Sequence, residues 1–542
     1  MLTSRRRRFV LVVVGALVAA ASYTQLGLAQ RASRVGRGAF ELEEATIAQL
    51  QRRMESGQET SRSLVEKYLA RIDAIDRRGP ALRSIIETNP DALAIADRLD
   101  AERKTKGARG ALHGIPVLIK DNIATNDRMM TTAGSLALVG VKPPKDAFIV
   151  ERLREAGAVI LGKTNLSEWA NFRSTHSSSG WSARGGQTKN PYALDRSPSG
   201  SSSGSGAAIA ASLAAVAIGT ETDGSIVSPS SHNSLVGIKP TVGLLSRTGI
   251  VPVAHSQDTP GPMARSVADA VALLSALVGQ DAADRATSEG PTRNVREYLD
   301  ALDPDGLKGA RIGIVRNGLF GYSPATDQLG EAAIDDIKKQ GAIVVDPVII
   351  PTLGRLSGAE FEVLLYEFKA DLNTYLESFG PLSPVRSLKD LVAFNLAHHD
   401  EELRYFGQEI LTMAEEKGPL SSPDYQAALA QNLRLSRTLG IDLVMDELEL
   451  DALMAPTTGP AWLIDHVNGD PSSGGQSPSR IAAVAGYPHI TVPAGYSRGL
   501  PIGVSFFGRR WSEPTLIKIA FAYEQATKHR RPPTFRRTAD LR

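Results

Sequence analysis

Short apolar runs alternate with helical stretches along most of this chain, and no other feature constrains its fold as strongly. Residues 64–75 and 147–156 have the apolar spacing of helices, whereas residues 115–119 and 159–162 have the length and composition of buried strands. Alternation of this kind indicates an α/β protein built around a sheet. Large α/β folds often form one unit, so the length of 542 residues does not by itself divide the chain into domains.

The same pattern returns further along the chain. Residues 312–315 and 343–345 are apolar runs that flank an amphipathic segment near residues 332–340, which predicts a strand, a helix and a second strand. Residues 355–450 are rich in helix formers, notably over 403–416 and 425–450. We interpret this stretch as a helical insertion in the sheet protein.

Composition excludes several classes of protein. With 42% hydrophobic residues and both charge signs well represented, the chain can bury a large core and does not resemble a disordered protein. The formal net charge is only +2, and much of the arginine lies near the two ends, so we expect no nucleic-acid partner. The chain has no cysteine, which excludes disulfides, thiolate nucleophiles and thiolate metal sites.

The first 29 residues have the layout of an export signal. Four arginines at 5–8 precede an apolar run at 9–21, and the sequence GLA at 27–29 would suit cleavage before Gln30. The apolar run is short of the about 20 residues that span a bilayer, and RRRF at 6–9 resembles a twin-arginine signal. We therefore expect a periplasmic or secreted protein with no stable membrane insertion after cleavage. An uncleaved signal that anchors the protein is the alternative.

Two serine-containing turns stand close together in the middle of the chain. Residues 197–206 read SPSGSSSGSG, a composition typical of linkers, but residues 207–218 follow directly and are expected to form a helix of small residues. Residues 219–226 then read GTETDGSI, a second turn that carries a serine. Two such turns separated by one helix could bring two hydroxyl groups together.

A nucleophilic serine needs a base, and the familiar arrangements fit this sequence poorly. GSSSG at 200–204 matches the G-x-S-x-G elbow with Ser202 as nucleophile, but that elbow follows a buried strand, whereas DRSP at 195–198 is polar and contains a proline. The chain has no S-x-x-K motif.

A lysine is the remaining candidate base. The apolar run GIPVLI at 114–119 ends at Lys120, and burial at the end of a strand could lower the pKa of that ammonium group by several units. A lysine whose head reaches water beside a structural Asp121 is the alternative that this residue alone leaves open.

A series of motifs in fixed order now identifies a resemblance. GIPVLIKD at 114–121, the serine-rich loop and TDGSI at 222–226 are accompanied by GKTNLSEW at 162–169, GIKPTVGL at 237–244, GPMAR at 261–265, APT at 455–457 and AGYP at 485–488. Together they resemble the amidase-signature family over nearly all of the chain that would remain after cleavage. The resemblance implies a single large α/β catalytic domain at 40–530, with a mixed β-sheet core covered by helices.

The family's chemistry, carried onto the matching positions, implies an amidase with a Ser-Ser-Lys triad. Ser225 would be the acylated nucleophile, Ser201 the bridging serine beside a cis peptide bond, and Lys120 the general base. The oxyanion would be held by backbone N–H groups of Thr222, Asp223, Gly224 and Ser225. No metal or organic cofactor is expected, since the sequence offers no metal-ligand motif such as HExxH.

Some positions depart from the broad family pattern. Ser199, Ser203 and Asp223 stand where glycine is common, and Val227 replaces a frequent arginine. These departures resemble the bacterial peptide-amidase branch, whose members release ammonia from the C-terminal amide of peptides, so a peptide or small-molecule amide is the expected substrate. Asp223 could instead be structural.

Three other functions remain open from the sequence. One is hydrolysis of other small or fatty-acid amides. The second is a tRNA-dependent amidotransferase subunit, which an export signal would contradict. The third is a non-catalytic binding protein on the same scaffold, although none of the three triad residues is lost.

Overall fold

The computed structural model describes residues 40–290, 294–381, 383–471 and 477–541. The expected export signal at 1–29 lies outside these residues. Residues 44–542 form one compact unit. Among the described residues, no helix has both the length and the apolar character needed to cross a membrane.

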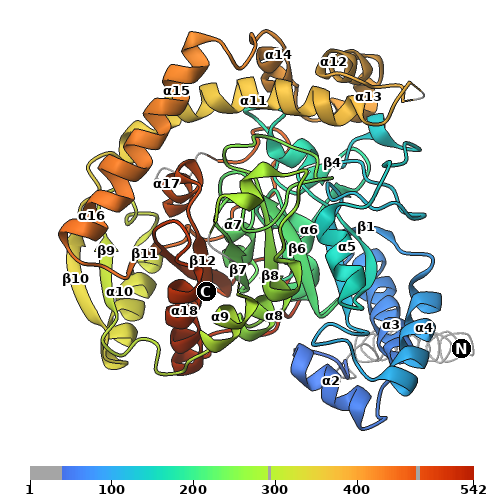
Figure 1. Cartoon of the computed structure of the whole chain (residues 1–542), viewed down its shortest axis with the longest axis horizontal. Helices are drawn as coiled ribbons and strands as arrows, with labels where there is room; N and C mark the ends of the chain where they lie inside the picture. Colours follow the sequence, from blue (N-terminus) through green and yellow to red (C-terminus); the bar gives the residue numbers. More distant parts are fainter. Residues whose placement is uncertain (1–39, 291–293, 382, 472–476, 542) are drawn as a thin grey trace, which may run out of the picture. The chain divides into compact units, whose positions relative to one another are not determined.

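A mixed sheet of 11 strands forms the centre of the molecule, as the sequence predicted, in the order β1-β3-β2-β6-β8-β7-β12-β13-β11-β9-β10 (Figure 1). Its strands are β1 (Ile85–Thr88), β2 (Pro116–Lys120), β3 (Val159–Thr164), β6 (Val216–Glu221), β7 (Val236–Lys239), β8 (Thr259–Ala264), β9 (Arg311–Val315), β10 (Ile343–Val348), β11 (Ala452–Pro456), β12 (His489–Ser497) and β13 (Leu500–Phe507). A two-stranded ribbon, β4 (Trp181–Ser182) with β5 (Gly186–Gln187), stands apart from this sheet. The predicted unit at 312–345 is present as parallel strands β9 and β10 joined by the helix α10.

Helices flank the sheet in two groups. In one group, α5 contacts α8, α8 contacts α18, and α18 contacts α10; in the other, α6 contacts α7, while α7 and α17 both contact β13. The helices outside the region 357–447 are α2 (Ile47–Glu55), α3 (Ser61–Arg71), α4 (Ala92–Lys106), α5 (Phe148–Glu155), α6 (Ser203–Ala210), α7 (Val227–His232), α8 (Val267–Leu277), α9 (Val295–Asp300), α10 (Pro324–Lys339), α17 (Pro478–Ala485) and α18 (Glu513–Thr527), with the π-helix η1 (Ile72–Arg77) and the short 3₁₀ turns η2 (Leu136–Leu138), η3 (Glu168–Asn171), η4 (Arg285–Ser288) and η5 (Leu353–Arg355).

Hydroxyl side chains fix where several helices begin. Thr46, Thr60, Ser266 and Ser323 each accept a hydrogen bond from a backbone N–H in the first turn of the helix that follows. Such caps satisfy N–H groups that have no partner inside the helix.

Residues 357–447 are interrupted by connecting stretches at 378–381, 383–387, 403–408 and 416–422 but are mainly helical, as expected. They contain α11 (Ser357–Glu377), α12 (Leu388–Ala397), α13 (His399–Glu402), α14 (Glu409–Glu415), α15 (Pro423–Leu433), the π-helix η6 (Arg434–Ile441) and α16 (Asp442–Glu447). The helix formers at 403–416 do not form one continuous helix, because residues 403–408 are not helical. The carbonyls of Glu402 and Phe406 accept hydrogen bonds from the buried side chain of Arg173, so tertiary contacts replace helical ones there.

A second expectation also needs correction. Residues 207–218 do not form one helix: α6 ends at Ala210, and residues 216–221 are strand β6. Ser212 adopts a positive φ of 54°, and Val216, Ala217 and Ile218 pair in parallel with β2. The prediction extended the helix of the Ala-rich start too far, because Val216 and Ile218 are β-branched, favour strand and find a partner in β2.

Candidate active site

Parallel pairing of β2 with β6 builds the site. Val117, Leu118 and Ile119 lie opposite Val216, Ala217 and Ile218. The two strands therefore end at the same edge of the sheet, where β2 presents Lys120 and β6 presents Thr220. The loop before α6 supplies Ser201, and the turn after β6 supplies Ser225.

Lys120 is fully buried and does not reach water, so the alternative of a solvent-reaching lysine is wrong. Its Nζ lies 2.7 Å from Ser201 Oγ, 2.9 Å from Thr220 Oγ1 and 3.3 Å from the Thr220 carbonyl. Burial lowers the pKa of the Lys120 ammonium from 10.5 to about 7, and the carboxylates of Asp258 and Glu221 oppose that shift only in part. A substantial share of the lysine is therefore a neutral amine at neutral pH.

The two serines belong to loops that contact each other. The peptide bond between Gly200 and Ser201 is cis, as the resemblance implied. The backbone N–H of Ser202 donates to the carbonyl of Ser225 at 3.2 Å. Within the described residues, Ser225 Oγ makes no hydrogen bond, and 8% of the residue is exposed. The structure thus joins Lys120 to Ser201 and sets Ser225 in the adjoining turn with its hydroxyl unpaired.

The backbone around Ser225 has free donors. The N–H groups of residues 222–225 donate no hydrogen bond to any part of the chain that the structure describes. Directly after them, the N–H groups of Ile226 and Val227 donate to Glu221 Oε2 at 2.7 and 3.0 Å. The buried Glu221 carboxylate therefore fixes the end of the turn while its start stays available to a ligand.

Ser202, the candidate of the elbow motif, has a structural role. Its Oγ donates to the Thr220 carbonyl at 3.1 Å and accepts from the Thr220 N–H at 3.2 Å, and the residue is fully buried. Both hydrogen-bonding functions of this hydroxyl are used by the core, so it is not placed to attack a substrate.

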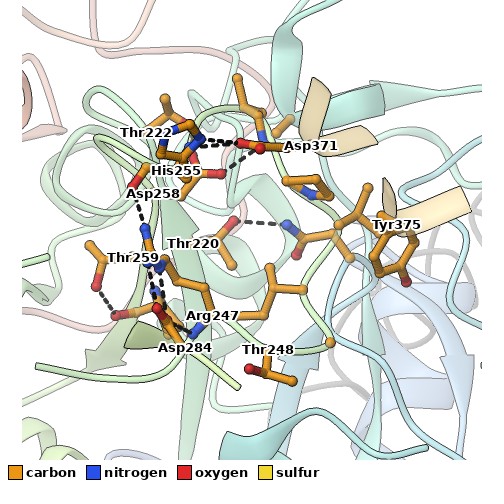
Figure 2. A pocket seen from close by; sticks show the side chains of 18 of the residues that line it. Thr220, Thr222, Arg247, Thr248, His255, Asp258, Thr259, Asp284, Asp371 and Tyr375 are labelled. Atoms are coloured by element: carbon orange, nitrogen blue, oxygen red, sulfur yellow. Dashed lines mark hydrogen bonds and ion pairs between the residues drawn. The ribbon is translucent and has the colours of Figure 1, made fainter. Parts of the chain in front are cut away.

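A cavity of about 330 Å³ adjoins the lysine (Figure 2). It shares Asn122 and Thr220 with the Lys120 environment, since Asn122 Nδ2 donates to Thr220 Oγ1 at 3.0 Å. Thr220 belongs to the turn GTETDGSI at 219–226 and Asn122 directly follows the motif GIPVLIKD at 114–121, but neither residue was predicted as part of the site. Thr222 and Asp258 also line the cavity, and Thr222 Oγ1 donates to Asp258 at 2.6 Å.

His255 and Asp371 line this cavity, and together with Glu367 they have the residue types of a metal site. The Nδ1 atom of His255 lies 2.8 Å from Asp371, and its Nε2 atom lies 3.4 Å from Glu367. Burial by itself would lower the pKa of His255, but the two carboxylates outweigh it and raise that pKa. Each ring nitrogen of His255 thus faces a different carboxylate.

Comparison with known proteins agrees with this geometry. The family model described as Amidase matches residues 63–517. The chain belongs to the amidase family. An Arabidopsis thaliana protein named as a probable amidase is 46% identical over 507 residues, which cover 92% of each chain.

Solved structures of other amidases are also similar. The peptide amidase of Stenotrophomonas maltophilia shares 54% identity with a TM-score of 0.87, covering 92% of this chain and 99% of its own. The peptide amidase PAM in complex with the competitive inhibitor chymostatin shares 54% identity with a TM-score of 0.88, covering 91% and 99%. This amidase is therefore a hydrolase that acts on amides.

Proposed function

We propose that this amidase hydrolyses the C-terminal carboxamide of peptides and releases ammonia, with Ser225 as nucleophile, Ser201 as proton relay and Lys120 as general base. The contact of 2.7 Å between Ser201 Oγ and the buried Lys120 amine carries the proposal. A neutral amine beside a hydroxyl group can accept its proton, which is what activation of a serine requires.

The first half of the reaction forms an acyl-enzyme. Ser225 Oγ bonds to the amide carbon while its proton passes to Ser201, whose own proton passes to Lys120. The free N–H groups of residues 222–225 donate to the oxyanion. As the C–N bond breaks, the proton returns from Lys120 through Ser201 to the departing nitrogen, and ammonia leaves.

The second half reverses these roles with water. Water attacks the acyl carbon, gives its proton to the same relay, and the carboxylic acid leaves as Ser225 regains a proton. The hydrogen bond from Ser225 to Ser201 forms when substrate binds, because such contacts in ligand-free enzymes are often long.

The proposed substrate class rests on two similar solved structures. Both are named peptide amidase, and one of them was solved with the competitive inhibitor chymostatin. The departures from the family pattern at Ser199, Ser203 and Asp223 point the same way.

The test is ammonia release from an N-acetylated dipeptide amide by the wild type, Ser225→Ala, Lys120→Ala and Ser202→Ala. We expect losses of at least about 10³-fold in kcat for Ser225→Ala and Lys120→Ala, with Ser202→Ala retaining activity. Activity that survives Ser225→Ala would refute the nucleophile. A wild type that hydrolyses only simple or fatty-acid amides would refute the substrate class, and one that hydrolyses no amide would favour a binding protein.

A further inference from the structure

An arginine outside the triad lies beside the turn that carries Ser225. Arg480 is in the first turn of α17, directly after Ser479. The Oγ of Ser479 donates to Asp223 Oδ1 at 2.6 Å. A methyl group added to Gly224 would stand 3.1 Å from the same Ser479 Oγ. The start of α17 is therefore packed directly against the residues that precede the proposed nucleophile.

The folded chain places two carboxylates, Glu360 and Asp223, near the Nε atom of Arg480. Its Nε lies 2.9 Å from Glu360 Oε2 on α11 and 3.6 Å from Asp223 Oδ2. These contacts are ion pairs rather than aligned hydrogen bonds. The Nη atoms donate no hydrogen bond to the described residues, and 38% of the side chain is exposed. The Nη–H groups are thus available to a ligand that binds beside Asp223, two residues before Ser225.

The charges around this arginine favour a neutral ligand. Burial, together with the carboxylate of Asp223, raises the pKa of Glu360, and Arg480 opposes that shift. When Glu360 is protonated, the positive charge of Arg480 and the negative charge of Asp223 cancel. When Glu360 is ionised, the three groups together carry a net negative charge. An anion gains little here, whereas a carbonyl oxygen still gains hydrogen bonds from the Nη–H groups.

We propose, building on the peptide-amide function above, that Arg480 is a substrate-binding residue. Its Nη–H groups donate to a backbone carbonyl of the peptide on the acyl side of the scissile amide. Peptide amides carry such an additional carbonyl, and amides of plain alkyl chains do not. Arg480 would therefore select peptides among amide substrates.

The test compares two substrates of similar length, an N-acetylated dipeptide amide and an unbranched alkyl amide whose sole carbonyl is the scissile one. For Arg480→Gln we expect kcat/KM to fall at least about 10-fold on the dipeptide amide and less than about 3-fold on the alkyl amide, because a hydrogen bond to a charged donor is lost from only one of them. Arg480→Lys keeps the charge but not the planar pair of donors, so it should restore the dipeptide activity only in part.

Arg437→Gln is the matched control, since Arg437 Nε donates to the carbonyl of Ala485 at the other end of α17. It should change both activities equally and weakly. An equal loss on both substrates in Arg480→Gln, or no loss, overturns the inference and leaves the peptide-amidase function standing. If Arg480→Gln does not fold, the same comparison is made with Arg480→Lys, whose kcat/KM should fall more on the dipeptide amide than on the alkyl amide. A wild type inactive on the dipeptide amide overturns both.

Discussion

At the scale of single residues, the site depends on one amine kept away from water. Lys120 has hydrogen-bond partners in Ser201 and Thr220 but no carboxylate in contact, so burial decides its protonation. Each unit of pKa shift corresponds to about 1.4 kcal/mol between the two protonation states. Burying this amine therefore lowers the stability of the folded state and leaves the amine partly neutral.

This gives a prediction for the pH dependence of activity. With neutral Lys120 as the proposed base and its pKa at about 7, kcat/KM should fall about tenfold per unit below pH 7 and level off above about pH 8. The measurement is kcat/KM on a peptide amide from pH 5 to pH 10. A midpoint near 10 would show that the lysine keeps its ordinary pKa. Asp258→Asn should shift the midpoint to lower pH, since the Asp258 carboxylate raises the pKa of Lys120.

Ser202 allows a second prediction at this scale. Replacing it with alanine removes two buried hydrogen bonds to Thr220 and should reduce the free energy of unfolding by about 1 to 3 kcal/mol, while kcat stays within about tenfold of the wild type. Urea unfolding and ammonia release measure the two effects. A variant that is stable but inactive would make Ser202, rather than Ser225, the nucleophile.

At the scale of elements, helix α6 depends on close approach between backbones. A methyl group on Gly204 would lie 2.2 Å from the Ser84 carbonyl oxygen and 2.5 Å from that of Asn165. Neither atom can move without moving a strand end or its flanking loop. The Gly and Ser content of this segment therefore reflects tight packing beside the active site, not the flexibility of a linker.

We accordingly predict that Gly204→Ala lowers the free energy of unfolding by about 3 kcal/mol or more, and that any folded fraction has reduced kcat. Ser203→Ala is the control in the same turn, because the one contact of Ser203 Oγ is a long one of 3.4 Å to Ser167, and it should cost less than about 1 kcal/mol. Thermal unfolding of the two variants makes the comparison. If Gly204→Ala and Ser203→Ala are equally stable, the backbone around Gly204 can move to accommodate a methyl group at little cost.

At the scale of the whole molecule, a buried arginine links the helical region to the sheet body. Arg173 pairs with Glu168, donates to the carbonyls of Glu402 and Phe406, and is completely buried. Its guanidinium also lies over the ring of Phe406, 4.3 Å from the ring centre. This one side chain therefore supplies hydrogen-bond donors to carbonyls at the end of α13 and in the non-helical segment between α13 and α14.

Removing the arginine should weaken that attachment. For Arg173→Met we expect a loss of about 3 to 5 kcal/mol, because the Glu168 carboxyl and the carbonyls of Glu402 and Phe406 would all lose their buried donor. Hydrogen exchange should show faster opening of α12, α13 and α14 than of the central strands. Arg316→Met is the control, since Arg316 pairs with Glu331 and Asp346 on the surface and should cost at most about 1 kcal/mol. Equal losses would contradict the proposed link.

The sequence by itself determined the α/β class, four of the 11 strands of the sheet and the motifs that carry Lys120, Ser201 and Ser225, because a buried strand must be apolar over its whole length and a tight turn needs small residues. Its error at 207–218 arose because the Ala-rich start of that segment favours helix, whereas Val216 and Ile218 at its end favour strand and pair with β2. Residues 403–408 are not helical, and the Phe406 carbonyl among them accepts a hydrogen bond from the side chain of Arg173.

Only the tertiary structure decided which distant side chains meet. His255 and Asp371 stand 116 residues apart in sequence yet share a hydrogen bond on the cavity wall, and Arg480 reaches the turn of Ser225 from a separate helix. The periodicity of the sequence does not predict such contacts between distant residues, since they depend on how whole elements pack. The depth of burial that lowers the pKa of Lys120 is likewise a property of everything packed around it rather than of its neighbours in sequence.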